Sequence, residues 1–199
     1  RIRFPTQDVR HVVEDILQLK LDVMIHEDYG FYSYAEHYVL GDVFVLTSPD
    51  KEKGTLLELK GKGCRQMESY LLAQHRSWYD FLMDALVEGG VMKRLDLAIN
   101  DMAGILDIPE LTEKCNREEC ISVFRSFKSY RSGELVRSNE QDRYGMGNTL
   151  YIGSLKSEVY FCIYEKDYEQ YVKYDIPIED TKIKNRFEIR LKNERAYYA

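Results

Sequence analysis

The sequence predicts an α+β protein, with a largely antiparallel β-sheet and helices packed on one face. Segments such as RLDLAIND and NRFEIRLK alternate apolar and polar residues with the period of half-covered strands. Other segments have apolar residues at helical spacing. TLLELKGKGC and RFEIRLKNERA share one pattern, in which an acid between apolar residues precedes basic residues and a helix. The chain therefore reads as two similar halves, each ordered β-α-β-β-β-α.

The first half begins with the strand RIRFP and a helix, QDVRHVVEDILQL, which Thr6 or Asp8 caps. YGFYSYAEHYVL and DVFVLTS then form a hairpin with its turn near Gly41-Asp42. TLLELKG is the next strand. One helix follows from about Arg65 to Glu88, closed by the glycine pair after it.

The second half begins with the strand KRLDLAIND and a short helix, IPELTEKC, opened by Pro109. The polar stretch 126–148 reads as a long loop with some strand character. TLYIGS, EVYFCIYEK and NRFEIRLK are strands, and NERAYYA turns into a helix. We expect an N-terminal domain over residues 1–90 and a second domain over 91–199. The chain starts at Arg1 and stops inside a helix, so we expect the second domain to be truncated at its C-terminus.

The composition is that of a soluble globular protein, with 44% apolar and 31% charged residues. No apolar run approaches the roughly 20 residues that a membrane helix needs, and no signal-peptide pattern is present, so we expect no membrane association. The four cysteines contain no C-x-x-C spacing, and no histidine lies near the Cys115/Cys120 pair. Free thiols in a reducing cytoplasm are favoured over a zinc site.

The net charge of −6 argues against general nucleic-acid binding, but charge can cluster locally. Residues 182–195, KIKNRFEIRLKNER, form a basic stripe with only two acids. The loop 126–148 is a candidate for DNA contact, although a solvated loop explains its basic residues equally well. For the tyrosine-rich stretch 29–38, half-buried strand positions are favoured over base stacking. The basic residues of the loop are Lys128, Arg131, Arg137 and Arg143.

Alternation along the strands places one functional group of each strand opposite its apolar set. In RLDLAIND the apolar set is Leu95, Leu97 and Ile99, and in EVYFCIYEK it is Val159, Phe161 and Ile163. The opposite faces of the strands carry Glu58, Asp96, Tyr164 and Glu188.

If these strands share a sheet, the carboxylates and the tyrosine converge on one surface. Three carboxylates suit Mg²⁺ or Mn²⁺, which prefer oxygen ligands. The alternative is an ordinary solvated face, where acids and bases pair across strands without a metal. The residue pattern alone leaves both interpretations open.

The motifs RLDLAIND, YIGSLKSEVYFCIYEK and RFEIRLKNERA resemble those of the Rep_trans family of replication initiators and relaxases. These proteins serve rolling-circle plasmids and conjugative transposons of Gram-positive bacteria. The resemblance covers nearly the whole chain and is strongest to the transposon relaxases. It implies a cytoplasmic bacterial enzyme that nicks one DNA strand at an origin, through a tyrosine that becomes linked to the 5′ phosphate.

The resemblance also assigns roles to residues. Tyr164 of CIYEK is the nucleophile, and Lys166 or Arg186 is expected to lower the pKa of its hydroxyl. Asp96, Glu188 and, less securely, Glu58 are the expected ligands of Mg²⁺ or Mn²⁺. The expected DNA contacts are Arg94, Lys156, Arg190 and Lys192.

Some positions depart from the family pattern. Relatives often have arginine at Leu155 and at Cys162, so Lys156 is left to replace one phosphate contact. Relatives also often have aspartate at Asn100, which makes Asp101 an uncertain ligand. The implied partners are origin DNA, single-stranded or extruded, and a host helicase, with homodimerisation left open. The departures keep a second function in view, a non-catalytic domain that binds DNA or recruits a partner.

Overall fold

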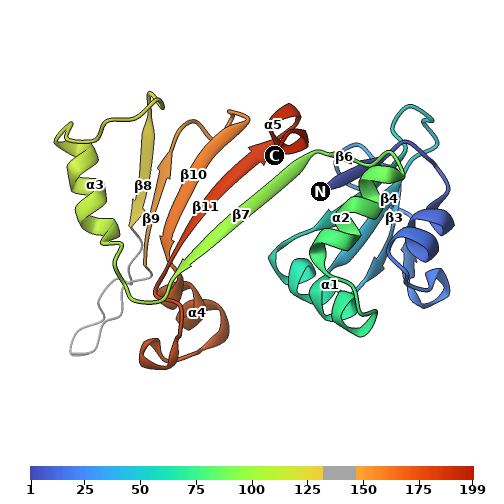
Figure 1. Ribbon diagram of the computed structural model, residues 1–199, viewed down its shortest axis with the longest axis horizontal. Coiled ribbons are helices and arrows are strands. Elements are labelled where there is room, and N and C mark those ends of the chain that lie inside the picture. The colour runs from blue at the N-terminus through green and yellow to red at the C-terminus, as the bar shows by residue number, and fades with distance from the viewer. Residues whose placement is uncertain (132–146) are drawn as a thin grey trace. The chain divides into compact units, whose positions relative to one another are not determined.

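The computed structural model describes residues 1–131 and 147–199, which form two compact units (Figure 1). Unit 1 comprises Arg1–Arg94 with Ala196–Ala199, and unit 2 comprises Leu95–Arg195. Each unit contains its own β-sheet with flanking helices. The prediction of an α+β protein with antiparallel sheets is confirmed. Among the described residues, no helix is both long enough and apolar enough to cross a membrane.

The sheet of unit 1 has the strand order β2-β3-β4-β5-β1-β6. The turn at Gly41-Asp42 joins β3 and β4 as predicted, with Gly41 in the left-handed region at a φ of 60°. The first strand of the chain, β1, is inserted beside the last long one, β5. The strands are β1 (Ile2–Phe4), β2 (Ile25–Glu27), β3 (Glu36–Leu40), β4 (Val43–Thr47), β5 (Thr55–Leu59) and β6 (Val91–Met92).

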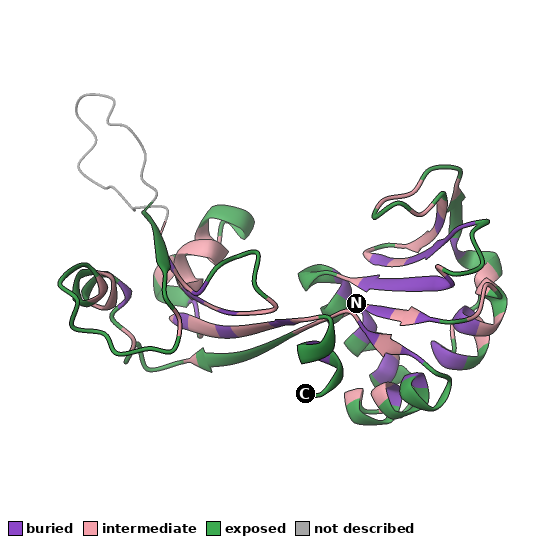
Figure 2. Cartoon of the chain, turned by 90° about the horizontal axis from the view of Figure 1, so that it is seen from above, coloured by how far each residue is buried: buried purple, intermediate pink, exposed green. Residues whose placement is uncertain are grey.

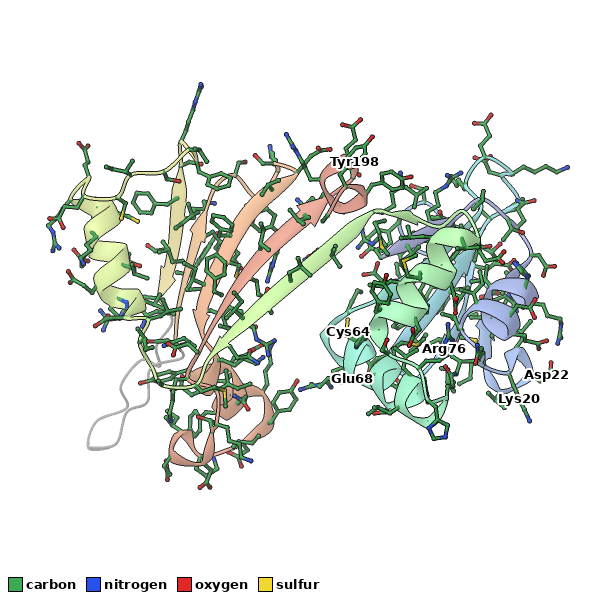
Figure 3. The ribbon with its side chains drawn as sticks, viewed as in Figure 1. Lys20, Asp22, Cys64, Glu68, Arg76 and Tyr198 are labelled. Carbon is green, nitrogen blue, oxygen red and sulfur yellow. The ribbon has the colours of Figure 1, made fainter. Side chains whose placement is uncertain are left out.

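The long helix predicted from Arg65 to Glu88 is wrong, because two helices occupy this region: α1 (Gly61–Ala73) and α2 (Trp78–Val87). Ser77 ends the continuity by capping α2, and it exchanges hydrogen bonds with Asp80 in a capping box. Arg76, in the link between the helices, donates to the carbonyl oxygen of Ile16 at 3.2 Å and so ties the link to the unit's core (Figure 3).

The predicted N-terminal helix is a π-helical segment, η1 (His11–Ile16), and a short 3-10 helix, η2 (Leu21–Val23), follows it. The core of unit 1 lies between its sheet and the helices η1, α1 and α2. Its largest fully buried side chains come from both layers, and Figure 2 shows these elements with many buried positions. They include Phe4, Ile16, Leu17, Leu46, Leu57, Met67, Leu71 and Phe81.

The sheet of unit 2 has the order β7-β11-β10-β9-β8, so its first strand is again inserted beside its last (Figure 1). From β8 to β11, each strand pairs antiparallel with the next strand along the chain. The predicted loop 126–148 contains β8, and its basic residues Arg137 and Arg143 lie outside the described residues. The strands are β7 (Arg94–Asp101), β8 (Phe127–Arg131), β9 (Asn148–Ile152), β10 (Val159–Glu165) and β11 (Asn185–Lys192).

One face of this sheet is covered by α3 (Ile108–Asn116), whose Ile108 packs with Leu150 and Ile163 in a small core cluster. The other helices are α4 (Lys166–Tyr174), the 3-10 helix η3 (Ile178–Asp180) and α5 (Glu194–Tyr197). α4 follows β10 directly, and its side chains line a cavity together with residues from the opposite face of β10. The helices of this unit therefore do not all lie on one face.

The edge strand β7 differs from the sequence interpretation. Its alternate residues Leu97 and Ile99 were expected in the core, yet they are 48% and 70% exposed. The small α3 cluster consists of residues from α3, the segment before it and strands β9 to β11, so it does not extend to this edge. Alternation thus gives the correct facing of the side chains but does not say whether anything covers that face.

Candidate active site

The polar face of unit 2 is built on the pairing of β10 with β11. In this antiparallel register Tyr160 lies opposite Arg190, Cys162 opposite Glu188, and Tyr164 opposite Arg186. Residues directly opposite each other point to the same side of a sheet. The pairing therefore gathers on one face the outward residues that alternation predicts for both strands.

A hydrogen-bonded chain links three of these residues. The hydroxyl of Tyr164 donates to Oε1 of Glu188 at 2.9 Å. Oε2 of Glu188 accepts from Nε and Nη2 of Arg190 at 3.0 and 2.7 Å. Glu188 is only 8% exposed, and a buried carboxylate is tolerated when it is paired and hydrogen-bonded. The phenol of Tyr164 thus contacts a carboxylate that an arginine holds in place.

The pKa of the Tyr164 hydroxyl is raised well above its ordinary value of 10. Burial is the largest cause, followed by the negative charges of Glu188 and Glu169, and Arg186 opposes them only in part. Arg186 acts in the expected direction, but burial and the two carboxylates outweigh it, so the pKa of Tyr164 is raised and not lowered. Tyr164 is neutral at neutral pH and needs a base to become a nucleophile.

Lys166, the expected motif lysine, is the first residue of α4. Its ammonium group forms an ion pair with Glu169, one turn along the helix, and lies 5.5 Å from the centre of the Tyr164 ring. Nε of Arg186 donates to Oδ1 of Asn100 on β7 at 2.8 Å. Both cations are thus near Tyr164, but each is engaged by another side chain.

Arg190 also connects β11 to β7, since its Nε lies 3.8 Å from Oδ2 of Asp96. Together with the Arg186–Asn100 contact, this shows that the two strands run in opposite directions. Asp96 and Glu188 therefore both face Arg190. They are two of the three expected metal ligands. Carboxylate oxygens are suitable ligands for Mg²⁺ or Mn²⁺. In the structure Arg190 balances their negative charge.

Glu58, the third expected ligand, lies on β5 in unit 1 and is 4% exposed. Its carboxylate forms an ion pair with Nε of Arg1 and accepts from Nη2 of Arg1 at 3.2 Å, and the hydroxyl of Tyr32 donates to it at 3.4 Å. Across residues 1–131 and 147–199, no group of three or more His, Cys, Asp or Glu side chains is arranged to hold a metal ion. A ligand set that includes Glu58 stays a prediction.

A cavity of about 350 Å³ opens beside Tyr164. Its floor is the polar face of β9 and β10, and α4 forms part of its wall. Its volume is at the lower end of the range for small-molecule sites. The lining combines a phenol, carboxylates and cations, and includes Tyr151, Cys162, Tyr164, Glu169, Lys173 and Arg190.

The other expected DNA contacts lie on β7, on β11 and in the turn before β10. Lys192 donates to the carbonyl oxygen of Leu155 at 2.6 Å and lies 4.9 Å from the centre of the Tyr160 ring. Lys156 is exposed, and Arg94 is half-buried at the start of β7. Lys128 and Arg131 are exposed on β8, which is consistent with either interpretation of that stretch.

The sequence interpretation missed one residue of the site, Glu169, and left the role of another, Asp101, open. Glu169 lies in the cavity, and its spacing to Lys166 and Lys173 on one helix face is the signal that could have revealed it. Asp101 was left as an uncertain metal ligand, but its carboxylate accepts from the backbone amides of Ala103, Gly104 and Leu106 and from Asn185. These bonds hold its pKa at about 2, chiefly through Asn185, and fix the loop after β7.

Comparisons with known proteins agree with this geometry. Residues 90–199 match the family model Rep_trans, described as replication initiation factor, and residues 1–84 match the N-terminal domain of rolling circle replication initiation proteins. A Bacillus subtilis (strain 168) protein named "Putative DNA relaxase NicK" is 46% identical over the whole chain, which spans 55% of that relative's length. The solved rolling circle replication initiator protein of Geobacillus stearothermophilus superposes with a TM-score of 0.78 at 25% identity, covering 99% of this chain and 73% of the other.

Proposed function

The chain belongs to the Rep_trans family of replication initiation factors, and from this premise we propose that it nicks one strand of origin DNA through Tyr164. The observation that carries the proposal is the hydrogen bond from the Tyr164 hydroxyl to the buried Glu188 carboxylate, at the edge of a cavity. A nucleophile within hydrogen-bond reach of a base that a third group orients is the usual arrangement for covalent catalysis.

In the proposed reaction Glu188 accepts the phenolic proton as the Tyr164 oxygen attacks the scissile phosphorus. A bond forms between this oxygen and phosphorus, and the bond from phosphorus to the 3′ oxygen breaks. The 3′ oxygen takes a proton from water, and the 5′ phosphate stays on the tyrosine. Since one phosphoester replaces another, the strand can later be rejoined.

The cations around Tyr164 have a separate role in the proposal. Arg186 lies directly opposite Tyr164 on β11, and Lys166 lies beside the ring, so both can balance the charge of the phosphate. Arg190 orients the Glu188 carboxylate through two hydrogen bonds. Lys192, Lys156 and Arg94 are the proposed contacts to the DNA backbone on either side.

Asp96 and Glu188 are the residues that would hold Mg²⁺ or Mn²⁺ on this face, and Glu58 is carried as a third, untested ligand. When bound, such an ion polarises the scissile phosphate and offsets its charge. Arg190 already contacts the carboxylates of Asp96 and Glu188, so its guanidinium would compete with the ion for these oxygen atoms.

The proposed substrate is an origin, for transfer or for replication, in single-stranded or extruded form. A mobile element in a bacterial cytoplasm, a domain boundary near residue 90, a host helicase and self-association remain predictions from the family.

The test is to incubate the protein with Mg²⁺ or Mn²⁺ and a supercoiled plasmid that carries the element's origin. We expect nicked circles with protein attached to the 5′ end. Tyr164→Phe, which removes only the hydroxyl, should reduce nicking by at least about 1,000-fold. The matched control is Tyr32→Phe in unit 1, which also loses a hydroxyl that contacts a glutamate and should nick normally.

If Tyr164→Phe nicks as fast as the wild type, the assigned nucleophile is wrong. If the wild type binds the origin strongly but neither nicks nor becomes attached, the non-catalytic DNA-binding function is the better description.

A further inference from the structure

Two cysteines lie in contact at the end of α3. Cys115 is in the last turn of the helix and Cys120 is in the segment that follows. Their sulfur atoms are 3.5 Å apart. No other described pair of cysteine sulfurs is in such contact in unit 2, whose remaining cysteine, Cys162, is buried on β10.

The backbone after α3 explains this contact. Glu118 adopts a left-handed conformation with a φ of 60°, and the amide of Glu119 donates back to the carbonyl oxygen of Lys114 at 2.9 Å. This reversal is typical of helix C-termini and folds the chain back over the last turn. Cys120 is thereby brought against Cys115 by local backbone geometry.

The environments of the two thiols differ. Cys115 is half-buried and packs against the core cluster of Ile108, Leu150 and Ile163, whereas Cys120 is exposed. Burial, and then the neighbouring thiol of Cys120, raise the pKa of Cys115 to about 11. Cys115 is therefore almost entirely a neutral thiol at pH 7, and an oxidant from solvent meets Cys120 first.

We propose that Cys115 and Cys120 are a reversible dithiol–disulfide pair that ties the end of α3 to the segment leading into β8. A disulfide bond is about 2.05 Å long, so the two sulfurs need to approach by roughly 1.5 Å, which side-chain rotation can supply. The ring so formed spans residues 115–120 and lies at the C-terminal end of the helix that covers the core face of the sheet.

The reaction with glutathione disulfide balances in two steps. The Cys120 thiolate attacks one sulfur of glutathione disulfide, which forms a mixed disulfide and releases one glutathione. The Cys115 thiolate then attacks the Cys120 sulfur, forms the internal bond and releases a second glutathione. The protein loses two electrons and two protons, and two glutathione molecules gain them.

The test is to equilibrate the native chain with mixtures of reduced and oxidised glutathione and to trap the remaining thiols. We expect the count to fall from four to two, with a mass loss of about 2 Da, and peptide mapping should join Cys115 to Cys120. Dithiothreitol should restore all four thiols.

Two variants make the result specific. Cys115→Ser should retain one glutathione on Cys120, because no second thiol displaces it, and Cys120→Ser should resist oxidation at Cys115. Cys64→Ser is the matched control, since Cys64 lies on α1 of unit 1, and this variant should form the disulfide normally (Figure 3). A glutathione adduct that persists on Cys120 of the wild type, or four thiols retained under oxidation, would overturn the proposal.

Discussion

The two units repeat one strand order and use it for different purposes. The order β2-β3-β4-β5-β1 in unit 1 corresponds to β8-β9-β10-β11-β7 in unit 2, with the first strand inserted beside the last in both. β5 and β11 then occupy the same place, and each carries a buried glutamate, Glu58 or Glu188. Each glutamate binds an arginine and accepts from a tyrosine hydroxyl.

The difference lies in the surroundings of the two glutamates. Phe44 on β4 lies directly opposite Glu58 on β5. The guanidinium carbon of Arg1 lies over the Tyr32 ring, 3.9 Å from its centre. Cys162 lies opposite Glu188, and the neighbouring tyrosine borders a cavity. In unit 1 this charged arrangement is enclosed by aromatic rings, whereas in unit 2 its tyrosine and its arginine line a cavity. This comparison indicates that access to the tyrosine beside the glutamate, more than the type or burial of the glutamate itself, distinguishes the two arrangements.

Substitution of the two glutamates is the sharpest way to break this comparison. Glu188→Gln keeps the shape of the side chain but removes the base, so nicking should fall by about 1,000-fold. Glu58→Gln should lower the stability of unit 1, because a buried arginine contact is weakened. A purely structural role of Glu58 predicts a nicking rate within about threefold of the wild type, whereas a ligand role predicts that nicking is lost. Nicking of origin plasmid and thermal unfolding measure the two effects.

A result in which Glu58→Gln stops nicking while the fold stays stable would contradict the structural role given to Glu58. It would instead support Glu58 as a ligand of the required metal. A shift in the Mg²⁺ dependence of this variant, compared with Asp96→Asn, would support the ligand role independently.

The facing of the site could be read from the sequence, because strand alternation depends only on the period of two. It correctly placed Tyr164, Glu188 and Asp96 opposite the apolar residues of their strands. The raised pKa of Tyr164 could not be read, because burial is its largest cause, ahead of the charges of Glu188 and Glu169, and part of the burial and Glu169 come from α4, which lies on the polar face. No local pattern reports which face a following helix covers.

The fold shows the same division between local and non-local information. Turn residues predicted the β3–β4 hairpin, and the acid-containing motifs predicted the repeat of the two halves. The break between α1 and α2 was missed although the capping residues Ser77 and Asp80 are visible in the sequence. The exposure of Leu97 and Ile99 could not be anticipated, since it depends on where α3 packs.

The cores of the two units provide the second prediction. Most of the largest fully buried side chains among the described residues belong to unit 1, and Ile108 and Leu150 are those of unit 2. Phe81→Ala in unit 1 and Leu150→Ala in unit 2 should each cost about 3–4 kcal/mol. Because the cores are separate, hydrogen exchange should show the loss of protection chiefly in the unit that carries the change. Equal loss in both units would show that they unfold as one body.

The third prediction concerns Asp101, which fixes the loop after β7. Its pKa is about 2 in the folded chain, below the ordinary 3.8, so its stabilising effect is complete above about pH 4 and is lost as the pH falls toward 2. Asp101→Asn should cost roughly 1.5 kcal/mol at pH 7, after allowance for solvent screening, and much less near pH 2. Urea unfolding at both pH values measures this.

The control for Asp101 is Asp8→Asn in unit 1, in the segment between β1 and η1. Asp8 accepts one backbone hydrogen bond, from His11, compared with the several that Asp101 accepts. A smaller loss of stability at pH 7 is expected for this variant. If both substitutions lower the free energy of unfolding by the same amount, the hydrogen bonds of Asp101 contribute no more to stability than the single bond of Asp8.

The smallest predicted effect tests the feature that distinguishes the two units, the cavity wall formed by α4. The carboxylate of Glu169 raises the pKa of Tyr164 and engages Lys166 and Lys173 in ion pairs. Glu169→Gln removes the negative charge and releases Lys166, which lies beside the tyrosine ring, so both changes favour the phenolate. Loss of these ion pairs should cost less than about 1 kcal/mol of stability.

We therefore expect Glu169→Gln to nick about threefold faster at neutral pH, with its pH–rate profile displaced to lower pH. Glu179→Gln, an exposed substitution in η3 with the same change of charge, should leave the profile in place. A slower Glu169→Gln enzyme would show that Lys166 must be held by Glu169 to act on the phosphate. In that case α4 would contribute to nicking by positioning a cation, and the raised pKa of Tyr164 would be a consequence of that positioning.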